Sequence, residues 1–205
     1  MLLLNTRGRL THEPHVVQRC LLETVMRADP HDLLCFTETH QLPNATLPVL
    51  QGYSLACAVP GTPGRNGMGR GGVAIYVRTS LVGRVRCWRS REGVAWVQLR
   101  GRVGRPLWVG TCYVPPKQSS TQLDAFFDGL QLDVAAAQAA GAAICLCGDF
   151  NGRTASLPDW VEAVPTQSGA PVGRPSRTSC DLEVNPQGRK LLGFCATTGL
   201  GIANG

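Results

Sequence analysis

The chain has 205 residues, which is the size of one ordinary domain and too short for two full domains. Hydrophobic residues make up 43% of the sequence and charged residues only 17%, and this balance excludes an intrinsically disordered chain. The longest uncharged, mainly apolar stretch, at 134–148, is too short for a membrane helix and no secretion signal is visible, so we expect an intracellular protein that is not secreted, has no membrane contact and is compatible with the nucleus.

Short apolar runs ending in polar or glycine-rich turns alternate with a few segments of helical spacing, which predicts a mixed α/β fold. In the first half the predicted elements are, in order, a strand at 2–4, a helix at 13–28, a strand at 32–37, a strand near 53–59 within a proline- and glycine-rich loop at 41–71, and strands at 72–77, 82–88, 94–100 and 107–114. The second half predicts a helix from 119–121 to 140, a strand at 142–147, a proline- and serine-rich segment at 152–185 with a helical turn near Trp160, and a helix at 188–198.

The cysteines are scattered along the chain in a way that argues against a disulfide framework. There are nine of them, an odd number without CxxC pairs, and this pattern indicates a reducing compartment. Cys145 and Cys147 stand two apart in an apolar run, so a strand would point both to the same face. We interpret them as a buried thiol pair and assign no metal-binding role to any cysteine.

The positive charge is unevenly placed. The chain has a net charge of +6, yet ten arginines against the single acid Glu92 give residues 61–105 a net charge of +9. A basic segment of this kind is typical of a polyanion-binding surface. Arginines that keep the outer faces of strands soluble are an equally open interpretation.

Polar residues follow three of the predicted strands where the apolar pattern does not require them: Asn5, Glu38, and the pair Asp149 and Asn151. If these strands are parallel neighbours in one sheet, their carboxyl ends meet at one edge, which is where α/β proteins bind ligands. Carboxylate and amide oxygens are hard ligands that suit Mg²⁺, and the set holds no histidine–cysteine cluster for zinc. Taken singly, each residue is also an ordinary turn former or solvated strand end.

Five ordered motifs carry a family resemblance over nearly the whole chain. They are N-x-x-G at 5–8, F-T-E-T-H at 36–40, G-R-G-G-V-A-I at 69–75, Y-V-P-P at 113–116 and G-D-F-N at 148–151. In this order they resemble the endonuclease/exonuclease/phosphatase superfamily. Within it, E-T-H, G-G-V-A-I, Y-V-P-P and the run at 185–205 are most similar to the endonuclease domain of non-LTR retrotransposons. The resemblance implies an α/β fold, a four-layer αββα sandwich of the DNase I-like type, and Mg²⁺-dependent nicking of DNA, with Mn²⁺ as an alternative cation.

The same resemblance implies roles for individual residues. Glu38 would be the metal ligand, and Asn5 would support the metal and the phosphate. Asp149 would orient or deprotonate the attacking water, while Asn151 and Tyr113 would contact the scissile phosphate. These roles suit phosphoryl transfer, which needs an in-line water, a base within hydrogen-bond reach and positive charge on the nonbridging oxygens.

DNA is the partner that the resemblance implies, and the candidate DNA-contacting residues are Arg70, Arg153 and His40. For His40 and Arg153 a surface or packing role is an equally open interpretation. A reverse transcriptase domain encoded downstream is a further partner that the retrotransposon resemblance implies.

Two motifs of the family do not occur in this chain. In the family a serine–aspartate pair and then an aspartate–histidine pair follow the last segment seen here, and that histidine is catalytic, whereas the last histidine of this chain is His40. We therefore expect residues 1–205 to form one domain that is incomplete at its C-terminus, lacks its last strands, and cuts DNA weakly or not at all. Two alternatives stay open: a noncatalytic remnant that binds nucleic acid, and a phosphatase of the same superfamily.

Overall fold

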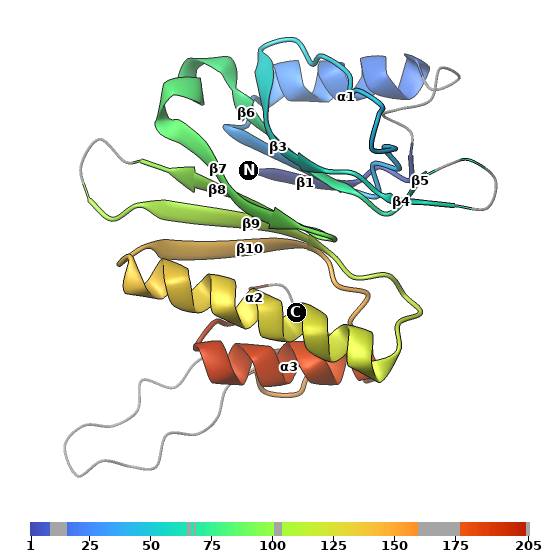
Figure 1. The fold of residues 1–205 in the computed structure, drawn as a ribbon, viewed down its shortest axis with the longest axis vertical. Coiled ribbons are helices and arrows are strands. Elements are labelled where there is room, and N and C mark those ends of the chain that lie inside the picture. Colours follow the sequence, from blue (N-terminus) through green and yellow to red (C-terminus); the bar gives the residue numbers. More distant parts are fainter. Residues whose placement is uncertain (9–15, 65–66, 68, 101–103, 160–176, 204–205) are drawn as a thin grey trace. The chain divides into compact units, whose positions relative to one another are not determined.

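The computed structural model describes residues 1–8, 16–64, 67, 69–100, 104–159 and 177–203 (Figure 1). These residues form two compact units. The first, here called the sheet unit, consists of Met1–Pro115 and Ala136–Asp149, and the second, the helical unit, consists of Pro116–Ala135 and Phe150–Gly205. Among the described residues no helix is long and apolar enough to cross a bilayer.

The sheet unit contains two four-stranded sheets. The first has the order β1 (Leu2–Asn5), β2 (Leu33–Thr37), β6 (Val73–Arg78), β3 (Tyr53–Val59). The second has the order β10 (Ala143–Asp149), β9 (Leu107–Tyr113), β8 (Val94–Leu99), β7 (Val85–Arg91). In each sheet one edge strand pairs in parallel, β1 with β2 and β10 with β9, and the other pairs are antiparallel.

The core of this unit lies between the two sheets. Cys35 and Ile75 from the first sheet pack with Val97 and Val109 from the second in one buried cluster. On the outer face of the first sheet, helix α1 (Val16–Ala28) contributes Met26 to a second cluster (Figure 1). Strand β2 is therefore covered on both faces, which explains why its sequence is a continuous apolar run rather than an alternating one.

Helices dominate the helical unit. Helix α2 (Ser120–Ala139) begins in it, preceded by a reciprocal cap in which Gln122 N donates to Ser119 Oγ at 3.2 Å and Ser119 N donates to Gln122 Oε1 at 3.0 Å. Helix α3 (Pro186–Thr198) has Pro186 in its first turn and ends at Gly199, whose φ of 73° suits a left-handed C-terminal cap. Phe127 of α2 contacts Phe194 of α3, with ring centroids 5.7 Å apart, and this contact holds the two helices together.

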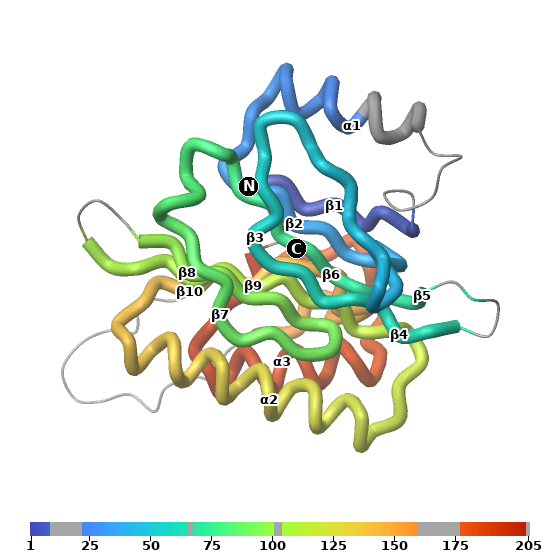
Figure 2. Tube along the Cα trace, turned by 45° about the horizontal axis from the view of Figure 1, so that its top comes forward, coloured from blue at the N-terminus to red at the C-terminus, as the bar shows by residue number. Residues whose placement is uncertain are grey.

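Several predicted elements differ from the observed ones. The strand predicted at 82–88 begins only at Val85, because the chain leaves β6 through a 3-10 helix, Thr79–Arg84, on its way to the second sheet. The loop predicted at 41–71 contains a short ribbon of two strands, β4 (Thr62–Pro63) and β5 (Gly69–Arg70), which Figure 2 shows beside the first sheet. The start of the helix predicted at 13–28 and the turn predicted near Trp160 lie outside the described residues.

Candidate functional site

The polar strand ends come together across two sheets. Asn5 ends β1 and Glu38 follows β2, and these strands are parallel neighbours as predicted. The expectation that all three strands share one sheet is wrong, because β10, which ends at Asp149, belongs to the second sheet. The ends still converge, since the two sheets pack face to face.

Asn5 links the two acidic residues. Its Nδ2 donates to Glu38 Oε1 at 2.9 Å and to Asp149 Oδ2 at 3.0 Å, so one amide group holds both carboxylates. Its Oδ1 accepts from the backbone N of Arg7 at 3.1 Å, which fixes the orientation of the amide. The structure therefore brings together three of the four side chains predicted to gather, those of Asn5, Glu38 and Asp149, and Asn5 serves the two carboxylates as a donor.

The backbone around Glu38 is held in an uncommon conformation. Glu38 has a φ of 52° and His40 a φ of 53°, both in the left-handed region that non-glycine residues rarely adopt. The residues that follow β1 support this turn, because Thr6 Oγ1 donates to the Glu38 carbonyl at 2.9 Å and Gly8 N donates to it at 2.7 Å. His40 lies beside the carboxylate, with its Nε2 3.8 Å from Glu38 Oε2.

A buried phenol completes this side of the site. Tyr113 ends β9, where it is the register partner of Asp149, and only 8% of it is exposed. Burial, the charge of Glu38, a hydrogen bond to Glu38 and the charge of Asp149 together raise the pKa of Tyr113 to about 12. The phenol therefore stays protonated at neutral pH and can donate a hydrogen bond to an anionic ligand. Gly71 leaves room for the ring, since a Cβ there would lie 3.0 Å from Tyr113 Cε1.

We expect the ionisation of Tyr113 to report on this contact in buffer free of divalent cations. The pKa of Tyr113 is raised from 10 in the unfolded chain to about 12 in the folded protein, so its contribution to stability is full below pH 10 and is lost as the pH rises through 12. Glu38→Gln removes a neighbouring charge and should move the titration to lower pH. The phenolate absorbance, assigned with Tyr113→Phe, measures it, and an unchanged titration in Glu38→Gln would argue against the contact.

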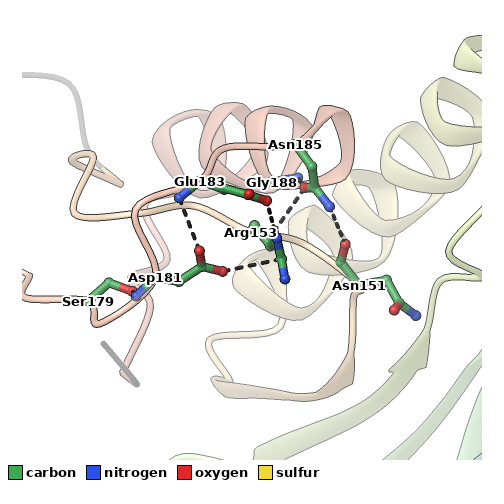
Figure 3. Close-up of polar contacts among 7 residues, drawn as sticks. All are labelled: Asn151, Arg153, Ser179, Asp181, Glu183, Asn185 and Gly188. Atoms are coloured by element: carbon green, nitrogen blue, oxygen red, sulfur yellow. Dashed lines mark hydrogen bonds and ion pairs between the residues drawn. The ribbon is translucent and has the colours of Figure 1, made fainter.

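Asn151 belongs to the helical unit, two residues beyond Asp149. Its φ is 46°, and its carbonyl accepts from Asn185 Nδ2 at 2.7 Å (Figure 3). Asn185 Oδ1 in turn accepts from Gly188 N at 2.7 Å, as the N-cap of α3, and from Arg153 N at 2.9 Å. A single asparagine side chain thus joins the start of α3 to the backbone on either side of Gly152.

The three residues predicted to contact DNA have different surroundings. Arg153 is ion-paired with Asp181, with Nε 3.3 Å from Oδ2, and with Glu183 (Figure 3). Arg70 is exposed at the end of β5, and His40 lies against Glu38. Arg70 is accordingly the candidate whose surroundings best suit an external anion.

Asn185 supports the backbone on both sides of Gly152 within the helical unit, a role that the sequence analysis did not identify. The available signal was the N-cap pattern of an asparagine followed by proline at the start of a helix.

Asn185→Ala is expected to lower the free energy of unfolding by about 1–2 kcal/mol, because it removes the cap of α3. Asn185→Ser, which keeps a capping oxygen, should recover much of that loss in urea denaturation, and equal losses in the two variants would contradict the assignment of the cap.

The donor set fits a magnesium ion better than a metal held wholly by protein ligands. Within the part of the chain that the structure describes, no group of three or more histidine, cysteine, aspartate or glutamate residues could hold a metal. Mg²⁺ commonly needs only one or two carboxylates, because waters and substrate phosphates fill its other positions. Glu38 and Asp149, held together by Asn5, offer such a pair of hard oxygen donors.

Comparisons with known proteins agree with this view of the fold. The model of the endonuclease/exonuclease/phosphatase family matches residues 4–175, whereas no curated protein matches the chain significantly. Similar solved structures include an AP endonuclease from Leishmania major, with a TM-score of 0.58 and 19% identity over 74% of this chain and 55% of that one. Another is an endonuclease/exonuclease/phosphatase family protein from Leptotrichia buccalis, with a TM-score of 0.53 and 13% identity over 72% of this chain and 65% of that one.

The catalytic domain of human Nocturnin is also similar, with a TM-score of 0.50 and 19% identity over 73% of this chain and 62% of that domain. The chain therefore spans between 55% and 65% of the length of these three structures. At these identities the likeness concerns the fold. The predicted DNase I-like α/β fold class is confirmed.

Proposed function

The chain belongs to the endonuclease/exonuclease/phosphatase family, and from this premise we propose that its site hydrolyses phosphodiester bonds of DNA with Mg²⁺, as a nicking endonuclease of the retroelement type. One observation carries the proposal: Asn5 donates to both Glu38 and Asp149 and so holds two carboxylates at one place. Paired carboxylates beside a neutral phenol suit the hydrolysis of a phosphate ester, in which one group binds a cation and another activates water.

Each residue of the site would then have its own task. Glu38 would hold the cation, with Mn²⁺ as an alternative to Mg²⁺, and the bound cation supplies positive charge for the nonbridging phosphate oxygens. Asp149 would orient the attacking water and accept its proton. Asn5 would hold the two carboxylates side by side by donating to both. Tyr113, protonated at neutral pH, would donate a hydrogen bond to the phosphate.

The amide of Asn151 would bind the same phosphate. One feature supports this part of the proposal: Asn151 follows Asp149 by two residues. Replacing Asn151 would then weaken cleavage without disturbing the carboxylate pair.

The distribution of charge favours a polyanion over a small phosphate ester as the substrate. Residues 61–105 carry a net charge of +9, and Arg70, within this segment, is exposed next to Gly71, which packs on Tyr113. Other arginines of the segment already bind the protein itself: Arg105 Nε donates to the Gly141 carbonyl at 3.0 Å, and Arg84 Nε donates to the Arg100 carbonyl at 3.1 Å. We therefore propose that only part of the basic segment contacts DNA.

A two-substrate assay tests the proposal against its alternatives. Residues 1–205, in excess over the substrate and incubated for hours with Mg²⁺, are expected to nick supercoiled plasmid only slowly and to release little phosphate from inositol phosphates. Phosphate release without nicking would favour the phosphatase alternative. Salt-sensitive DNA binding without either reaction would favour a noncatalytic nucleic-acid-binding protein.

A further inference from the structure

Two cysteines face each other at the edge of the sheet unit. Cys57 lies on β3, an edge strand of the first sheet, and Cys87 lies on β7, an edge strand of the second. Their sulfur atoms are 2.6 Å apart. A disulfide bond needs about 2.05 Å, so only a small movement separates the two thiols from a covalent link between the sheets.

The two thiols differ in their access to solvent. Cys87 is exposed, whereas Cys57 is 5% exposed and belongs to the core cluster between the sheets. Burial, together with a hydrogen bond to Cys87, raises the pKa of Cys57 to about 12. A solution oxidant can therefore reach Cys87 first, with Cys57 positioned behind it as the resolving thiol.

We propose that Cys57 and Cys87 form a reversible disulfide that fastens the two sheets to each other when the protein meets a disulfide oxidant such as oxidised glutathione. The Cys87 thiolate attacks one sulfur of oxidised glutathione, forming a mixed disulfide and releasing one glutathione thiolate. Cys57 then loses its proton to solvent, and its sulfur attacks the sulfur of Cys87 and expels the second glutathione. Two protein thiols are oxidised and one glutathione disulfide is reduced to two thiols.

This bond would link the two sheets covalently and stabilise the folded protein. The covalent path between Cys57 and Cys87 otherwise follows the chain between them, which includes β4, β5, β6 and the 3-10 helix. Closing this loop restricts the unfolded chain and so stabilises the folded protein. In a reducing compartment both thiols stay reduced, so the disulfide forms only under oxidising conditions. The inference does not depend on the proposed nuclease function.

The test is to equilibrate the protein in glutathione buffers of increasing oxidised fraction, quench with acid and digest with trypsin and chymotrypsin together. Cleavage after Tyr53 separates Cys57 from Cys35, and cleavage after Arg86 and Arg89 releases Cys87 in a short peptide. Mass spectrometry is expected to find the Cys57–Cys87 cross-linked peptide, and the melting temperature should rise by about 5–10 °C. Dithiothreitol should reverse both effects.

Two matched variants distinguish the proposal from general thiol oxidation. Cys87→Ser should abolish the cross-link and the rise in melting temperature, whereas Cys180→Ser, which removes an exposed cysteine of the helical unit, should retain both. Persistence of the mixed disulfide between glutathione and Cys87, with Cys57 still open to alkylation after denaturation, would overturn the proposal. A cross-linked peptide found only in dimers on a nonreducing gel would also overturn it.

Discussion

Replacing Asp149 with alanine is expected to lower the slow Mg²⁺-dependent plasmid nicking by residues 1–205 by at least about a hundredfold, because a positioned general base contributes about 10²–10⁴-fold to such a reaction. Asp149 is one of the two carboxylates that Asn5 holds, and it is the residue proposed to activate water. The measurement is the initial rate of nicked-circle formation with enzyme in excess, so that slow cleavage remains measurable.

Asp29→Ala is the matched control for this experiment. Asp29 follows α1 and precedes β2, at the end of that strand opposite to Glu38, and its side chain is 82% exposed. Its loss removes the same charge from the same unit and should leave nicking unchanged. Equal nicking by the wild-type chain and by Asp149→Ala would contradict the role given to Asp149 and would assign the activity to other residues.

Replacing Glu38 with glutamine is expected to abolish the stabilisation that Mg²⁺ gives to the folded protein. A cation that binds only the folded state at about 100 times its Kd stabilises that state by about 2.7 kcal/mol. The glutamine oxygen can still accept from Asn5, so the variant keeps the architecture of the site while losing the charge that holds the cation. Thermal melts with and without millimolar Mg²⁺ measure the difference.

The melts in Mg²⁺-free buffer provide a second check on the same variant. Glu38 and Asp149 carry like charges and share one donor, so removing one charge should leave the variant at least as stable as the wild type when no cation is present. Two results would contradict the assignment of Glu38 as the cation-binding residue. One is a wild-type melting temperature that Mg²⁺ does not raise, and the other is a rise of the same size in Glu38→Gln.

The residues at the strand ends show which part of the site can be predicted from the sequence alone. Their position at the ends of apolar runs is enough to single out Asn5, Glu38 and Asp149, and in the folded protein these three side chains are joined by hydrogen bonds. Their distribution over two sheets was not predictable, because the apolar pattern shows where a strand ends and not which strand lies beside it.

Other features depend on tertiary contacts that leave no local pattern. The apolar run at 2–4 predicts a buried strand, yet Leu3 is 40% and Leu4 39% exposed, because β1 lies at the edge of its sheet. The hydrogen bond of Tyr113 to Glu38 joins residues 75 positions apart, on β9 and after β2. Asn185 was recognisable as a helix cap, but its bond to the Asn151 carbonyl follows only from the folded arrangement.

The most direct test of the proposed cation site is anomalous diffraction from crystals of the protein soaked in Mn²⁺. The expected result is one strong peak within bonding distance of a carboxylate oxygen of Glu38, with Asp149 nearby and Asn5 still donating to both residues. Loss of the peak in crystals of Glu38→Gln would strengthen the assignment. Absence of a peak at Glu38 in the wild-type protein at millimolar Mn²⁺, or a peak bound by other residues, would contradict it.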